Sequence, residues 1–227
     1  MQKFNNGNFG KQFRFHSFAH EIKMEIQEKI LQGAAELFFK YGIKSITMDD
    51  IAKHVAVSKK TIYQHYDNKD KIVETMLMTE LNCHQDDIKE IVSRTKNVIE
   101  EFILVMQHME ELFTQMNPNV FYDLQKHHST IWSEFQKFKQ DFMATTIKDS
   151  INRGIEEGFV RNDFDKDIIT QLRISQIEMG FNPEIFPPSK YHVKDVQLSL
   201  LNHFLNGICT IKGQKLLEKH KAKLKLS

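Results

Sequence analysis

Apolar residues recur along this chain every three or four positions, the spacing that places side chains on one face of an α-helix. The first such stripe covers residues 22–41 and ends before Gly42, a residue type common just after a helix. Four prolines and nine glycines in 227 residues leave little room for a turn-rich β fold. The chain is therefore predicted to be all-α, with further long helices over residues 69–83, 86–116, 129–157, 165–181 and 193–211.

The segment 47–69 has a different pattern, which predicts two short helices joined by a tight turn. Thr47 and Ser58 are candidate N-caps, because their hydroxyls can accept a hydrogen bond from an amide in the first helical turn. Ala52 is small enough to let the second helix cross close to the first, opposite Ile62. Such a helix-turn-helix presents its second helix to the major groove of DNA.

Hydroxyls, lysines and aromatic rings are concentrated in this segment, mostly on the outer face of the second helix. Tyr63 and Lys69 are assigned to phosphates, whereas Thr61 and Gln64 are assigned to bases. Tyr66 lies four residues after Ile62 and can also face inward. Helix pairs with surface lysines also occur in ordinary bundles, so the pattern alone leaves that alternative open. The predicted DNA-binding residues are Thr47, Ser58, Lys59, Lys60, Thr61, Tyr63, Gln64, His65, Tyr66 and Lys69.

Three consecutive motifs are ILQGAAELFFKYGIKSIT, MDDIAKHVAVSKKTIYQHY and DNKDKIVETML. In order, spacing and residue type they resemble the DNA-binding domain of the tetracycline-repressor (TetR) family of bacterial regulators. Ala56 and Lys60 depart from the family pattern, which commonly has glycine at both positions. The turn must therefore tolerate a Cβ at Ala56, and Lys60 adds a charge near the recognition surface.

The resemblance implies an N-terminal three-helix helix-turn-helix domain over residues 21–68 and a helical ligand-binding and dimerisation domain over residues 69–211. Residues 1–20 are expected to be a disordered arm, with a minor-groove contact or a misassigned start before Met24 as alternatives. Residues 212–227 are expected to form a basic C-terminal tail. The helix over residues 69–83 is expected to transmit ligand occupancy to the DNA-binding head.

The charge distribution supports this division of the chain. Residues 1–72 carry 12 Lys/Arg and 8 Asp/Glu, whereas residues 73–211 carry 13 and 21. A basic end on an acidic body is typical of a protein that presents one end to a polyanion.

Methionines and aromatic residues are concentrated between residues 102 and 142, and such side chains can line a cavity for an apolar or amphipathic molecule. Their spacing alone favours a plain core, whereas the resemblance to the TetR family implies an inducer pocket in this region, so both interpretations stay open. The predicted ligand-binding residues are Met106, Met109, Phe113, Tyr122, Trp132, Phe135 and Gln176.

The last two main helices carry a broader apolar surface than one core requires. In the resembling family, the corresponding helices of two subunits form a four-helix dimer interface. The predicted interface residues are Leu172, Gln176, Met179, Leu200, His203 and Phe204.

Other classes of site find little support in the sequence. Cys83 and Cys209 lack metal-ligand spacing, His127 and His128 are adjacent, and enzyme motifs such as G-x-S-x-G or H-E-x-x-H are missing. We therefore expect no catalytic residues, no metal and no cofactor. No apolar run reaches the length of a membrane span, and the N-terminus lacks a signal-like apolar region, so a cytoplasmic location is expected.

The sequence thus predicts a ligand-responsive, homodimeric transcriptional regulator that binds a palindromic double-stranded operator. Repression is the expected mode, and an unknown small-molecule inducer is expected to release the protein from DNA. The alternative is a helical interaction or ligand-sensing protein that has lost operator binding.

Overall fold

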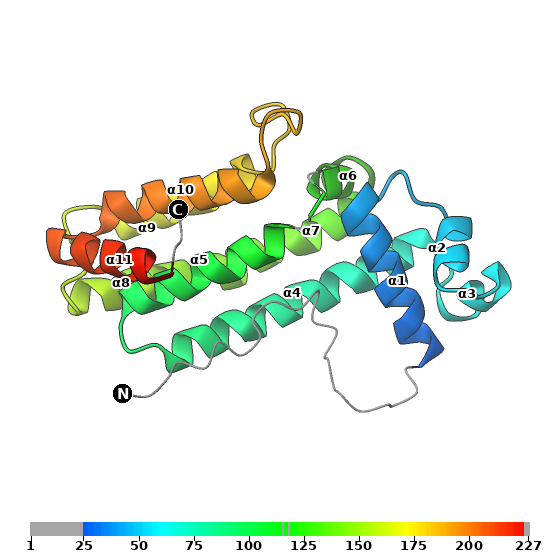
Figure 1. Ribbon diagram of the computed structural model, residues 1–227, viewed down its shortest axis with the longest axis horizontal. Coiled ribbons are helices and arrows are strands. Elements are labelled where there is room, and N and C mark those ends of the chain that lie inside the picture. The colour runs from blue at the N-terminus through cyan, green and yellow to red at the C-terminus, as the bar shows by residue number, and fades with distance from the viewer. Residues whose placement is uncertain (1–24, 115, 118, 225–227) are drawn as a thin grey trace.

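The computed structural model describes residues 25–114, 116–117 and 119–224, with side chains described through residue 221. Across these residues the molecule is an elongated array of helices (Figure 1). Its β-type pairing within the described ranges is limited to one isolated bridge between Val160 and Cys209. The predicted all-α fold is confirmed, while the predicted arm over residues 1–20 lies outside the described residues.

Three helices form one end of the molecule. They are α1 (Ile26–Tyr41), α2 (Met48–His54) and α3 (Lys59–His65), and they are followed by the long α4 (Lys69–Arg94). In Figure 1, α2 and α3 lie at the right-hand end, and α4 runs from there along the body. Gly33 permits a close crossing, because a Cβ on it would lie 2.2 Å from Cγ1 of Val55.

The remaining helices form the body. They are α5 (Val98–Thr114), α6 (Asn119–His127), α7 (Ser129–Phe138), the π-helical turn η1 (Lys139–Met143), α8 (Ala144–Glu156), α9 (Lys166–Met179), α10 (Val193–Ile208) and α11 (Ile211–Leu224). The turn η1 continues α7 directly into α8, so residues 129–156 form one continuous helical rod, close to the predicted span.

The buried apolar residues form two cores. The first joins the head to the adjacent part of the body, because it combines residues of α1–α4 with Val120, Leu124, Ile131 and Phe135. The second lies at the far end, between α5, α8, α10 and α11. The head therefore shares its core with α6 and α7 instead of being an independently packed unit.

The predicted boundaries differ from the structure in two places. In the first, the helix predicted over residues 69–83 continues as α4 to Arg94, so the helix predicted over residues 86–116 is divided between α4 and α5, which begins at Val98. The interruption has a capping arrangement: Asn97 Oδ1 accepts the amide of Glu100 at 3.0 Å, and Glu100 Oε2 accepts the amide of Lys96 at 2.9 Å.

The second difference concerns the C-terminus, where a basic tail was predicted over residues 212–227. Residues 211–224 instead form α11, whose Leu217 is fully buried in the second core. Thr210 starts this helix, because its hydroxyl accepts the amide of Gly213 at 3.1 Å. The periodic leucines on a lysine-rich background are the signal for this helix.

Candidate nucleic-acid interface and ligand cavity

The start of α2 is held by a reciprocal cap. Thr47 Oγ1 accepts the amide of Asp50 at 3.2 Å, and Asp50 Oδ2 accepts the amide of Thr47 at 2.9 Å. The Thr47 hydroxyl also donates to the same carboxylate oxygen at 2.6 Å. These bonds favour the ionised carboxylate and lower the pKa of Asp50. The cap thus fixes Thr47, the residue that directly precedes the first helix of the helix-turn-helix.

The turn between α2 and α3 contains a backbone conformation that usually requires glycine. Ala56 has a φ of 55°, in the left-handed region, where a Cβ carries an energetic cost. The Val57 amide donates to the Ala52 carbonyl at 3.0 Å, which closes the turn around this conformation. The Ala56 side chain is exposed, so it needs no space in the core.

The outer face of α3 carries the predicted recognition residues. Lys59, Lys60, Tyr63 and Gln64 are exposed, whereas Thr61 and His65 are partly buried. Ser58 caps the helix by accepting the Thr61 amide at 3.0 Å, and its hydroxyl lies 2.7 Å from that of Thr61. Ile62 anchors the opposite face and is fully buried. The predicted DNA-binding residues therefore lie at one end of the molecule, although Tyr66 and Lys69 differ from the others in their contacts.

The two lysines that open α3 differ in their surroundings. Lys59 Nζ lies 3.0 Å from the carboxylate of Asp49, and this hydrogen bond raises the pKa of Lys59. Among the described residues Lys60 has no ion-pair partner, so its charge lies on the open face. Lys60 is thus the better placed of the two to meet a phosphate.

Tyr66 is placed in the core, not on the predicted DNA-contacting surface. It is 3% exposed, and its hydroxyl donates to the carbonyl of Gln27 at 3.4 Å. Its position one helical turn after Ile62 explains this orientation, because residues four apart share a face. Burial raises the pKa of its hydroxyl. The structure therefore does not support Tyr66 as a DNA ligand.

Lys69 also differs from its predicted role at a phosphate. Its ammonium group donates to the carbonyls of Ile43 and Ile46, both at 2.6 Å. Burial lowers the pKa of Lys69, because the ammonium group is partly removed from water. Lys69 holds the loop after α1 against the start of α4, which is a structural role inside the head.

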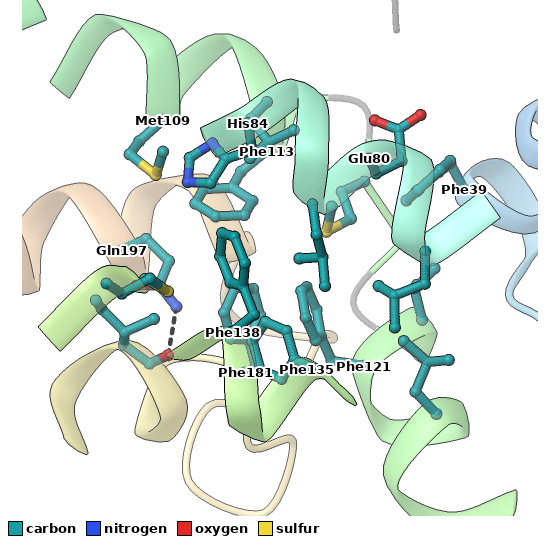
Figure 2. A pocket seen from close by; sticks show the side chains of 18 of the residues that line it. Phe39, Glu80, His84, Met109, Phe113, Phe121, Phe135, Phe138, Phe181 and Gln197 are labelled. Atoms are coloured by element: carbon teal, nitrogen blue, oxygen red, sulfur yellow. Dashed lines mark hydrogen bonds between the residues drawn. The ribbon is translucent and has the colours of Figure 1, made fainter. Parts of the chain in front are cut away.

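A cavity of about 110 Å³ lies between α4, α5, α6, α7 and α9. Figure 2 shows several phenyl rings directed toward one another around it, with Glu80 and His84 from α4 nearby. The closest pair is Phe121 and Phe181, whose ring centroids are 3.9 Å apart.

The predicted ligand-binding residues divide into two groups. Met109, Phe113 and Phe135 line the cavity, but Met106, Tyr122, Trp132 and Gln176 do not. Met106 belongs to the second core, and Trp132 packs beside Phe135 at 5.1 Å between ring centroids. Phe121 and Phe138 also line the cavity, and both lie in the stretch rich in methionine and aromatic residues, 102–142, for which a cavity is one of the two interpretations. Nothing in the local pattern marks Glu80, His84 or Arg173, which also line it.

Two polar side chains of α4 are perturbed by the apolar surroundings. Burial raises the pKa of Glu80 to about 7, and Asp87 adds to the effect. Burial lowers the pKa of His84 to about 3, and His84 Nδ1 lies 2.9 Å from Nε2 of His108. In the described part of the chain, no three His, Cys, Asp or Glu side chains are grouped as metal ligands.

The predicted interface residues on α9 and α10 surround a second, shallow hollow. Leu172, Gln176, His203 and Phe204 all line it, and Leu172 is 48% exposed. Met179 and Leu200 are partly buried and lie outside the hollow. The exposed large apolar side chains on these two helices are thus Ile168 and Leu172 of α9, because Phe204 of α10 is buried.

Comparison with known proteins identifies the head. Residues 30–76 match the family described as "Bacterial regulatory proteins, tetR family". This match covers α1, α2, α3 and the first residues of α4, the same elements that carry the motifs.

The head of this chain matches the TetR family.

Relatives extend the likeness of the chain beyond the head. The HTH-type negative transcriptional regulator IcaR of the biofilm operon icaADBC, from Staphylococcus aureus, is 26% identical over 79% of this chain and 99% of its own. The uncharacterized HTH-type transcriptional regulator YvaF of Bacillus subtilis is 24% identical over 81% of this chain and 95% of its own. Together with the match of the head, these relatives make the chain a helix-turn-helix transcriptional regulator and not an enzyme.

Solved structures agree on the fold. A TetR-family regulator from Agrobacterium tumefaciens has a TM-score of 0.68 at 14% identity, over 81% of this chain and 97% of that one. A putative regulator from Saccharomonospora viridis in complex with choline has a TM-score of 0.65 at 16% identity, over 81% and 97%. Like these neighbours, the chain has a helical body behind its head. None of its described helices is long and apolar enough to cross a bilayer.

Proposed function

We propose that this protein is a repressor that binds a palindromic operator as a homodimer and is released by a small amphipathic ligand. The observation that carries the proposal is the capped α3 helix, whose Lys60, Tyr63 and Gln64 side chains are exposed at one end of the molecule (Figure 1). A helix of this kind can enter the major groove, where Gln64 and Thr61 are available for base edges. The relative IcaR, a negative transcriptional regulator, supports repression as the mode.

Dimerisation is the second part of the proposal. Two heads must be held about 34–36 Å apart to occupy successive major grooves on one side of a duplex. The exposed Leu172 side chain of α9, which borders the hollow lined by His203 and Phe204 of α10, supports a self-complementary contact between two copies, because exposed apolar surface favours burial.

Ligand control follows from the position of the cavity. Met76, Leu77 and Leu81 of α4 line it, and the same helix begins beneath the head at Lys69. Helix α6 contributes Val120, Phe121 and Leu124 to its wall. A ligand that binds better to one spacing of the heads would shift the dimer toward that spacing. Choline in the neighbour from Saccharomonospora viridis shows that this fold can hold a small molecule.

A selection of duplexes from a randomised pool tests the operator proposal. The expected result is a palindromic consensus with half-sites about one helical turn apart, bound with steep salt dependence because phosphates release counterions. The matched control is Thr61→Val with Gln64→Ala, which should change the selected sequence without unfolding the head. Failure to enrich any sequence at low salt would contradict operator binding and favour a sensor that has lost it.

A further inference from the structure

Arg173 differs from the other buried charged side chains in lacking a partner. The buried charged side chains of the described residues are those of Glu101, Asp123, Lys139 and Arg173. Glu101 pairs with Arg153 and accepts the hydroxyl of Ser150, while Lys139 lies 2.8 Å from Glu178. Asp123 accepts a backbone amide at 2.8 Å. A buried charge ordinarily requires such compensation, because transfer out of water is costly.

Arg173 lies on α9, is 6% exposed, and lines the cavity. Its Nη1 is buried and has no hydrogen-bond partner among the described residues. The nearest compensation is the ring of Phe204, whose centroid lies 5.8 Å from the guanidinium carbon. An aromatic face attracts a cation but cannot accept the hydrogen bonds that a guanidinium donates.

We infer that the cavity binds a compact amphipathic monoanion, an apolar carboxylate whose charged group pairs with Arg173 while its hydrocarbon part lies among the phenyl rings. A carboxylate offers two acceptor oxygens that match the fork of guanidinium donors. The aromatic walls, including Phe113, Phe121 and Phe181, provide the apolar contact (Figure 2). This inference rests on the proposed function, since it names the chemistry of the ligand that the cavity would receive.

The size of the cavity limits the apolar part. A volume of about 110 Å³ is somewhat smaller than a cavity of roughly 150 Å³ that accommodates benzene. One ring with a short carboxylate arm is therefore the expected scale, with modest opening of the flexible Met109 and Met143 side chains that line the cavity. A long acyl chain would need a larger rearrangement.

Glu80 is the one acid among the cavity-lining residues, and it would favour a cation instead. Its charge, however, can be relieved without a ligand, because burial raises the pKa of Glu80 to about 7 and the carboxyl can take a proton near neutral pH. Arg173 has no such relief: burial lowers its pKa only to about 10, so the guanidinium stays charged. The positive charge of Arg173 is therefore the larger uncompensated charge at the cavity, and it favours an anionic ligand.

Three probes with one skeleton test the sign of the ligand charge: phenylpropanoate, phenylpropanol and phenylpropylamine. Dissociation constants are measured by calorimetry at neutral pH on the full chain. The acid is expected to bind at least about tenfold more tightly than the alcohol, because a buried charge-assisted pair forms with the acid alone. The amine is expected to bind most weakly, since it would meet the guanidinium with a like charge.

Variants at position 173 then test whether Arg173 causes the preference for the acid. Arg173→Met should bring the affinities for the acid and the alcohol within about twofold, while Arg173→Lys should retain a preference for the acid. Arg94→Met removes a charge from the partly exposed end of α4 and should leave the preference intact. If Arg173→Met fails to fold, which a thermal melt would show, Arg173→Gln replaces it.

The outcomes separate this inference from the proposed function. Binding of the alcohol or the amine as tightly as the acid, or a preference that survives in Arg173→Met, would overturn the anionic ligand and leave ligand control standing. Absence of binding for all three probes would overturn the inference. Release of operator DNA by the alcohol alone would show ligand control without an anion requirement.

Discussion

Asp123 on α6 accepts a hydrogen bond from the backbone amide of Lys44, with 2.8 Å between Oδ2 and the nitrogen. Lys44 lies in the segment that leads into the helix-turn-helix, and Asp123 is 5% exposed. Its neighbours Val120, Phe121 and Leu124 line the cavity. The same short helix therefore contacts both the cavity and the head, in addition to the link through α4.

Replacement of this carboxylate should weaken the attachment of the head. Asp123→Ala removes the acceptor and leaves the Lys44 amide unpaired, so the free energy of unfolding should fall by about 1–3 kcal/mol. Asp123→Asn keeps an amide oxygen at the same place and should cost less. Urea denaturation of the two variants measures the difference. Equal stability of Asp123→Ala and the unmodified chain would show that the bond contributes nothing.

The same pair of variants tests coupling between cavity and head. If α6 carries part of the signal, Asp123→Ala should reduce the ratio of operator affinities measured without and with a cavity ligand, because the head no longer follows α6. The measurement is a fluorescence anisotropy titration of operator DNA. An unchanged ratio would assign the coupling to α4 alone.

At Ala56 a substitution is expected to raise the free energy of unfolding instead of lowering it. Its φ of 55° is available to glycine without a Cβ contact, so Ala56→Gly should raise the free energy of unfolding by about 1 kcal/mol. Ala52→Gly is the matched control, because Ala52 lies within α2 and is buried. There the same substitution should cost about 1 kcal/mol or more. Thermal melts of both variants measure whether each substitution raises or lowers stability.

Much of this head can be read from the sequence, because its signals are local. Thr47 and Ser58 mark helix starts through hydroxyls that accept nearby amides, and the apolar stripe of α1 needs only its period. The break at Asn97 is harder to predict, since Val98 and Ile99 continue the apolar rhythm across it. A cap inside an uninterrupted stripe is easily overlooked.

The errors at Tyr66 and Lys69 have a different cause. Both residue types suit phosphate contacts, and only the packed head shows that their polar ends reach the carbonyls of Gln27, Ile43 and Ile46. The burial of Arg173 is likewise a property of how α9 packs on the body. Long-range contacts of this kind have no signature in the sequence around the residue.

The different positions of Lys60 and Lys69 predict separable effects. Lys60→Ala should weaken binding to all duplexes and reduce the slope of log affinity against log salt by about 1, because one phosphate contact is lost. Lys69→Met should instead lower the free energy of unfolding by about 1–3 kcal/mol, since two carbonyls lose their donor. Anisotropy titrations over a salt series and urea denaturation distinguish the two. A salt slope unchanged in Lys60→Ala would exclude the phosphate contact.

Glu80 predicts a dependence of stability on pH. Burial raises the pKa of Glu80 in the fold to about 7, above its ordinary value of 4.5, so the folded state holds the proton more tightly than the unfolded chain. The Glu80 contribution to stability is therefore fully present below about pH 4.5 and is lost as the pH rises through about 7. His84, whose pKa falls to about 3, acts in the opposite sense, because the unfolded chain takes up its proton first on acidification.

The variant Glu80→Gln separates the pH effect of the Glu80 carboxyl from the opposing effect of His84. The variant should gain stability relative to the unmodified chain as the pH rises from about 4.5 to 7, and the two should differ least at acid pH, where Glu80 is protonated. Urea denaturation at a series of pH values measures the difference. Parallel curves would show that the Glu80 carboxyl is not perturbed in the fold.

Leu172 provides the test of the proposed dimer. It is 48% exposed and borders the hollow shared by α9 and α10, so Leu172→Glu would place a charge in a contact between two copies. The variant is expected to become monomeric by light scattering at concentrations where the unmodified chain is dimeric, because burial of an unpaired carboxylate is costly. Operator affinity should fall with it, since a single head contacts one half-site.

Ile211→Glu is the matched control for Leu172→Glu. Ile211 is 73% exposed at the start of α11, outside the hollow, and the same charge there should change neither assembly nor DNA affinity. If Leu172→Glu remained dimeric while Ile211→Glu dissociated, the interface would lie on α11 instead of α9 and α10. If both stayed dimeric and bound the operator fully, neither of these exposed apolar positions would belong to the contact, and the two heads would have to be paired through another surface.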